Sequence, residues 1–86
     1  MAFSLEHLVN MVLEEARPYI SEINWTREKV GKIMETVSQI DEFITVLEKE
    51  IEKAVSTRKT DLKIFLIYFQ KRVKNVARER NTGRKF

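Results

Sequence analysis

Between Val30 and Ala54, apolar residues recur at alternating intervals of three and four positions. This heptad spacing is typical of a long amphipathic helix, because it keeps the apolar side chains in one seam along one side. The pattern runs for four heptads without a polar break, and it predicts a coiled-coil-like helix over about residues 25–55. The seam consists of Val30, Ile33, Val37, Ile40, Ile44, Leu47, Ile51 and Ala54.

Two arrangements can bury this seam: a bundle within one chain, or a two-stranded coiled coil. Met34, Phe43 and Val55 widen the apolar face beyond a strict coiled-coil seam, which favours the bundle. Trp25, at the start of the long helix, is then expected to close one end of the bundle; the alternative is an anchor for a partner protein.

Shorter helices are predicted on either side of the long one. The first covers residues 4–17, because Ser4 can cap it and Pro18 disfavours its continuation. The third covers residues 60–79 and is out of register with the heptads, so a turn must precede it. Its inward stripe is predicted to be Leu62, Leu66, Phe69 and Val73. The sequence therefore predicts an all-α, three-helix bundle over residues 1–79 with one long central helix, followed by a basic flexible tail, residues 80–86.

Composition narrows the functional classes. The 86 residues include no cysteine and a single histidine, His7, so we expect no metal site and no cofactor. Nucleophile–base pairs and glycine-rich phosphate loops are also missing, which argues against an enzyme or a small-molecule substrate. The longest apolar run has six residues, 64–69, so no membrane span is predicted. We expect a cytoplasmic protein, and the many Lys, Glu, Ile and Val residues resemble a heat-adapted composition.

Charge is divided unevenly along the chain. Residues 1–55 carry 6 Lys/Arg and 11 Asp/Glu, whereas residues 56–86 carry 10 and 2. An acidic body with a basic arm is a form common among proteins that contact nucleic acid or acidic partners. The simpler alternative is that the acidic first two helices complement the basic third helix inside one bundle.

The apolar run at residues 64–69 exceeds what the predicted stripe of the third helix needs. With that stripe turned inward and Phe65 on its flank, Ile64, Ile67 and Tyr68 point outward beside Lys71. An apolar patch framed by lysines marks an interaction surface, so these four residues are the predicted partner-binding site. The alternative is that Ile64 and Tyr68 cover an edge of a neighbouring helix.

Basic residues of the last third form a second candidate site, for nucleic-acid phosphates. No sequence-reading motif accompanies them, and a solvated basic face is the alternative. They are Lys71, Arg72, Lys74, Arg78, Arg80, Arg84 and Lys85.

These features favour a non-enzymatic helical adaptor or accessory subunit that docks on a larger protein or on a second copy of itself. A nucleic-acid-processing complex such as a polymerase would suit its size and charge. The alternative function is autonomous DNA or RNA binding through the basic third helix and tail. A membrane-surface helix is a weaker option, because the inner face of the third helix is needed for the core.

Overall fold

The computed structural model describes the backbone of residues 4–85 and the side chains of residues 4–75. Within these residues the chain is all-helical, without a strand, so the predicted all-α class is confirmed. None of the described helices combines the length and apolarity that crossing a membrane requires. The elements are α1 (Leu5–Ala16), the 3-10 helix η1 (Arg17–Tyr19), α2 (Ile23–Thr36), α3 (Ile40–Lys53) and α4 (Ser56–Lys85).

Residues next to α1 determine where this helix begins and ends. The Ser4 hydroxyl accepts a hydrogen bond from the backbone N–H of His7 at 3.2 Å, which is a side-chain N-cap. Pro18 then tightens the chain into η1, and Ile20, in extended conformation, donates its N–H to the Arg17 carbonyl at 3.3 Å. The chain thus leaves α1 through a rigid turn that displays Tyr19.

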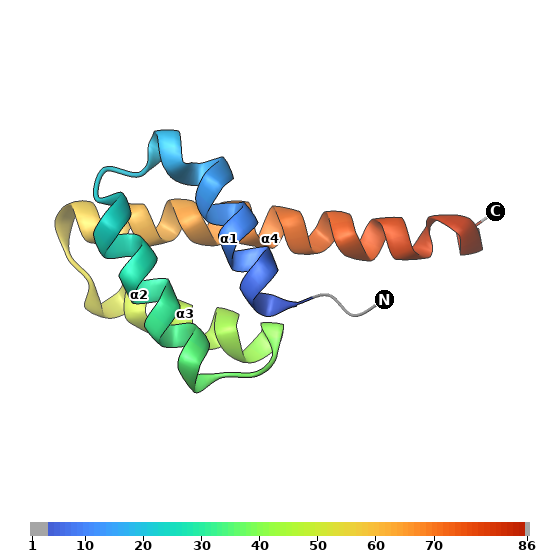
Figure 1. The fold of residues 1–86 in the computed structure, drawn as a ribbon, viewed down its shortest axis with the longest axis horizontal. Coiled ribbons are helices and arrows are strands. Elements are labelled where there is room, and N and C mark those ends of the chain that lie inside the picture. The colour runs from blue at the N-terminus through green and yellow to red at the C-terminus, as the bar shows by residue number, and fades with distance from the viewer. Residues whose placement is uncertain (1–3, 86) are drawn as a thin grey trace.

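The prediction of one long central helix over residues 25–55 is wrong, because the helix is interrupted between Thr36 and Ile40. Val37 and Gln39 are extended, and the Ser38 N–H donates to the Glu42 carboxylate at 3.1 Å, which secures the start of α3. The break lets α3 fold back beside α2 and carries Phe43 into the core (Figure 1). The three-helix bundle is therefore a four-helix arrangement.

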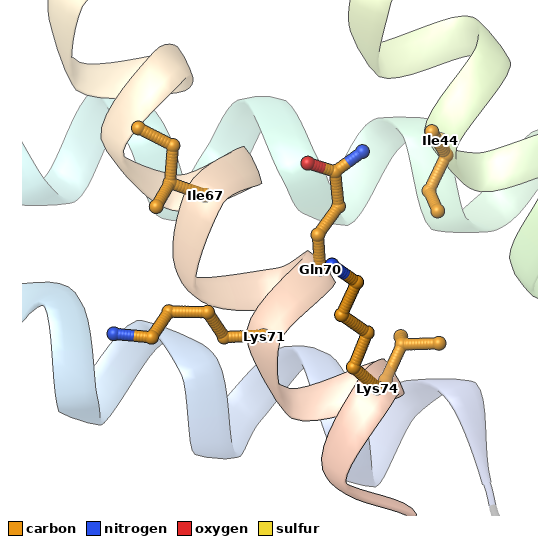
Figure 2. Close-up of a pocket in the computed structure, with 6 residues that line it drawn as sticks. Ile44, Ile67, Gln70, Lys71 and Lys74 are labelled. Carbon is orange, nitrogen blue, oxygen red and sulfur yellow. The ribbon is translucent and has the colours of Figure 1, made fainter. Parts of the chain in front are cut away.

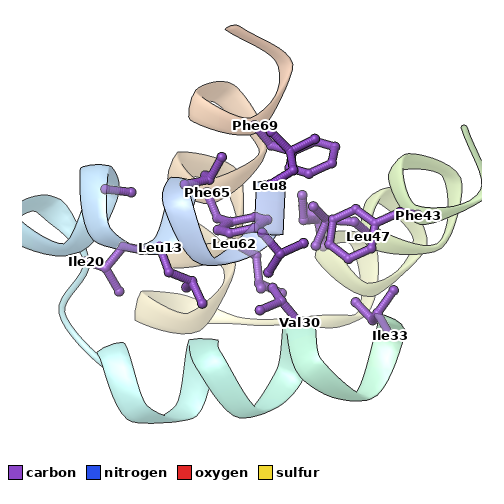
Figure 3. Packing of buried hydrophobic residues seen from close by; sticks show 14 residues of the cluster. Leu8, Leu13, Ile20, Val30, Ile33, Phe43, Leu47, Leu62, Phe65 and Phe69 are labelled. Atoms are coloured by element: carbon purple, nitrogen blue, oxygen red, sulfur yellow. The ribbon is translucent and has the colours of Figure 1, made fainter. Parts of the chain in front are cut away.

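Three phenylalanines form the centre of the core. The ring centroid of Phe43 lies 4.8 Å from that of Phe69 and 6.1 Å from that of Phe65, and all three side chains are fully buried. Side chains from α1 and α2 close around this cluster (Figure 3). The buried apolar residues are Leu8, Val9, Val12, Leu13, Ala16, Ile20, Val30, Ile33, Phe43, Leu47, Ile51, Leu62, Phe65 and Phe69.

Helix α4 is rotated relative to the predicted stripe. Phe65, expected on the flank, is fully buried, whereas Leu66 and Val73, expected inside, are only partly buried. The inward face is therefore turned by roughly 40° about the helix axis. The reason is that α4 packs mainly against α1 and α3, and Phe65 packs on Phe43 of α3 with the ring centroids 6.1 Å apart.

The connection from α3 to α4 is short and reverses the chain. Ser56 takes a φ of 54°, in the left-handed region, and α4 starts there instead of at residue 60. The other helices gather around the first half of α4, while its C-terminal part extends beyond them (Figure 1). The principal extents are 46 × 26 × 19 Å.

Candidate binding surface on helix α4

The predicted outward patch is divided into two parts. Ile67 is 56% exposed, but Ile64 and Tyr68 are partly buried and pack against the core. Tyr68 stacks on Tyr19 of η1 with the ring centroids 5.7 Å apart and the planes inclined by 24°. Tyr68 therefore covers a neighbouring element, as the alternative prediction had it. The rotation of α4 brings Tyr68 towards η1.

On the other side of Ile67, a groove of about 410 Å³ lies between α3 and α4. Ile44, Ile67 and Val73 supply its apolar lining, and Gln70, Lys71 and Lys74 supply polar atoms. We call this the α3–α4 groove. In Figure 2, Gln70 and Lys74 run beside one another towards the space between α4 and Ile44, whereas Lys71 extends to the opposite side of α4. The groove is therefore an apolar depression with one basic edge.

Lys71 connects this groove with the tyrosine pair. Its Nζ atom lies 5.6 Å from the ring centroid of Tyr68, within range of a cation–π interaction. Desolvation by burial, and secondarily the neighbouring Tyr19, raise the pKa of the Tyr68 phenol above its ordinary value. The phenol therefore keeps its proton to a higher pH than an ordinary tyrosine does.

The predicted phosphate-binding set is only partly available. Arg72 forms an ion pair with Glu15 of α1, so its guanidinium is already engaged. Lys71 and Lys74 are exposed and have no carboxylate partner among residues 4–75. The side chains of Arg78, Arg80, Arg84 and Lys85 lie outside the described residues, although their backbone continues α4.

Trp25 lies beside ion-paired residues near the start of α2. It is partly buried against the core, and the Arg58 guanidinium sits over its ring, 4.7 Å from the centroid. Arg58 also contacts the Glu22 carboxylate at 3.4 Å. These contacts tie the start of α2 to the start of α4 and leave Trp25 in a structural position.

Sequence reasoning missed three surface residues. Ile44 and Val73 were assigned to the core, and Tyr19 was not considered beside Tyr68. The available signal for Tyr19 was its place directly after Pro18, which restricts the backbone of the turn that carries it. Across the described side chains, no group of three His, Cys, Asp or Glu residues is placed to hold a metal ion.

The fold and surface define a small all-α protein with an apolar groove edged by lysine. Residues 6–74 match the model of the MJ1579 family, and the chain belongs to that family. This match spans the packed part of all four helices. No curated protein and no solved structure matches the chain.

Proposed function

We propose that this protein is a non-enzymatic helical adaptor that docks on a larger protein through the α3–α4 groove. The observation that carries the proposal is the groove itself, which a largely exposed Ile67 lines together with Ile44 and Val73. Exposed aliphatic side chains around a concavity favour burial against another protein.

The groove suits an amphipathic helix of the partner. A helix presents apolar side chains at intervals of three and four, and such anchors fill shallow apolar grooves between helices. Lys74 at the edge, together with Lys71 nearby, favours carboxylates on the flank of that helix. An accessory subunit of a nucleic-acid-processing complex, such as a polymerase, would place the basic α4 beside both an acidic protein segment and nucleic acid.

The test compares two exposed aliphatic residues. Ile67→Ser removes the apolar anchor of the groove, and Val55→Ser removes a similarly exposed aliphatic, 71% accessible, at the turn before α4. Each variant and the wild type are immobilised, and proteins captured from extract are identified and quantified. We expect Ile67→Ser to lose the specific partner at least about fivefold, as for an interface anchor, and Val55→Ser to retain it.

Thermal melting of each variant provides the fold control. Both residues are exposed, so each melting temperature should stay close to that of the wild type. Equal capture of the same proteins by wild type and Ile67→Ser would contradict docking through the groove.

A further inference from the structure

The geometry points to a second site: the Tyr19–Tyr68 pair, together with Lys71, binds unpaired bases of a single-stranded nucleic acid. The site differs from the α3–α4 groove, because neither tyrosine lines that groove, although Lys71 borders both. It does not depend on the adaptor proposal.

The first argument is the accessible ring. Tyr68 covers one side of Tyr19, yet Tyr19 remains 60% exposed, so the stack leaves aromatic surface open to a further planar group. Pro18 restricts the backbone of η1, and the stack on Tyr68 holds the Tyr19 ring in place. A pre-positioned ring loses little conformational entropy when a base stacks on it.

The second argument is charge. The Lys71 ammonium lies over Tyr68, is exposed, and has no carboxylate partner among residues 4–75. The neighbouring carboxylate of Glu15 is neutralised by Arg72. The Lys71 ammonium is therefore available for a phosphate next to the rings.

The third argument concerns the form of the nucleic acid. An aromatic platform beside cations is the arrangement by which proteins hold single strands without reading their sequence. Bases in a duplex are already stacked on one another, so the tyrosine pair can reach them only at an end. The site therefore favours single strands over duplexes.

The experiment measures the binding of a fluorescently labelled oligothymidylate, about 15 nucleotides long, by anisotropy at low salt. Tyr19→Leu removes the aromatic ring but keeps an apolar side chain, and Tyr19→Phe keeps the ring. We expect Tyr19→Leu to weaken binding at least about fivefold, the lower end for loss of one stacked base, and Tyr19→Phe to bind like the wild type.

Two further variants separate this site from general charge attraction and from the groove. Lys71→Gln should reduce the salt dependence by about one phosphate contact, whereas Tyr19→Leu should leave the slope unchanged. Ile67→Ser, which alters the groove without changing charge, should bind the strand like the wild type.

Three outcomes would overturn the proposal. They are the absence of strand binding by the wild type at low salt, unchanged affinity of Tyr19→Leu for the strand, and equal affinity of the wild type for a duplex of the same length. The last would show that the basic surface attracts any polyanion. Thermal melts of Tyr19→Leu and Tyr19→Phe, run in the same buffer, ensure that folded proteins are compared. If the strand result is negative while Ile67→Ser loses its protein partner, the adaptor proposal stands and only this site fails.

Discussion

The carboxylate of Asp61, near the start of α4, accepts the backbone N–H of Glu22 at 2.8 Å, 39 residues earlier in the chain. Its other oxygen accepts the N–H of Ser21 at 3.0 Å, and the side chain is only 1% exposed. Glu22 is the N-cap residue of α2, but its own side chain makes no capping hydrogen bond. Helix α4 therefore supplies acceptors for the chain entering α2, where an anion is also favoured by the helix dipole.

Replacing Asp61 with alanine should be strongly destabilising, because two amide groups would lose a charged acceptor inside the protein. We expect a loss of about 2–3 kcal/mol in the free energy of unfolding. Asp61→Asn retains an oxygen acceptor for one of the two amides, so its loss should be near 1 kcal/mol. Urea unfolding followed by circular dichroism measures both, and an alanine variant as stable as wild type would show that this cap is dispensable.

The break between α2 and α3 predicts unequal roles for two adjacent residues. Phe43 is fully buried between Phe65 and Phe69, whereas Ile44 is partly exposed at the groove. Phe43→Ala should cost about 3–5 kcal/mol, close to the total stability of a small domain. Ile44→Ala should cost less than about 2 kcal/mol, since fewer contacts are lost.

The denaturant midpoints of Phe43→Ala and Ile44→Ala are compared with that of the wild type. The order of the two losses tests whether the chain turns at residues 37–39 or forms one continuous helix. In a continuous heptad seam, Ile44 would occupy a central a position and its truncation would be the more damaging. A larger loss for Ile44→Ala than for Phe43→Ala would therefore contradict the break at residues 37–39.

Thr26 is fully buried, and its hydroxyl has no hydrogen-bond partner among the described residues. Valine has the same shape without the polar oxygen, so Thr26→Val should raise the free energy of unfolding by about 1 kcal/mol. Thr26→Ser is the matched control: it keeps the hydroxyl, loses a buried methyl group and should be destabilising. Differential scanning calorimetry of the three proteins makes the comparison, and a destabilised valine variant would mean that the hydroxyl has a partner.

Acid should weaken the link between α2 and α3. The Glu50 carboxylate accepts a hydrogen bond from Lys29, with Nζ 2.9 Å away, and this bond lowers the pKa of Glu50 below 4.5. Burial opposes the shift, while the positive charges of Lys29 and Lys53 add to it. The unfolded chain therefore binds a proton at Glu50 more readily than the folded protein does. The stabilisation is present above pH 4.5 and is lost as the pH falls through the folded pKa.

Glu50→Gln isolates this contribution. The wild type should exceed the variant at neutral pH by about 0.5–1 kcal/mol, because the pair is partly exposed, and the difference should vanish in acid. Unfolding free energies measured along a pH series give the comparison. A difference that persists undiminished below the folded pKa would assign it to packing instead of charge.

The helical class and the ends of α1 could be predicted from the sequence, because they depend on local chemistry. Heptad spacing, few glycines and a single proline specify helices wherever the chain lies, and Ser4 and Pro18 act on their immediate neighbours. The candidate surface was predicted in part: Ile67, Lys71 and Lys74 lie where an outward, basic α4 face places them. The acidic pair Asp41 and Glu42 was a local signal for the start of α3 that the unbroken heptad pattern concealed.

Other features depended on contacts between residues far apart in the chain. Whether α2 and α3 form one rod or a hairpin depends on what Phe43 can bury against, and that is Phe65 and Phe69. The same packing sets the rotation of α4, which turns Tyr68 onto Tyr19 and leaves Ile67 exposed at the edge of the α3–α4 groove. Periodicity identifies an apolar face, but it does not state which neighbour that face will meet. Only the tertiary structure determined that, because burial is shared among helices distant in sequence.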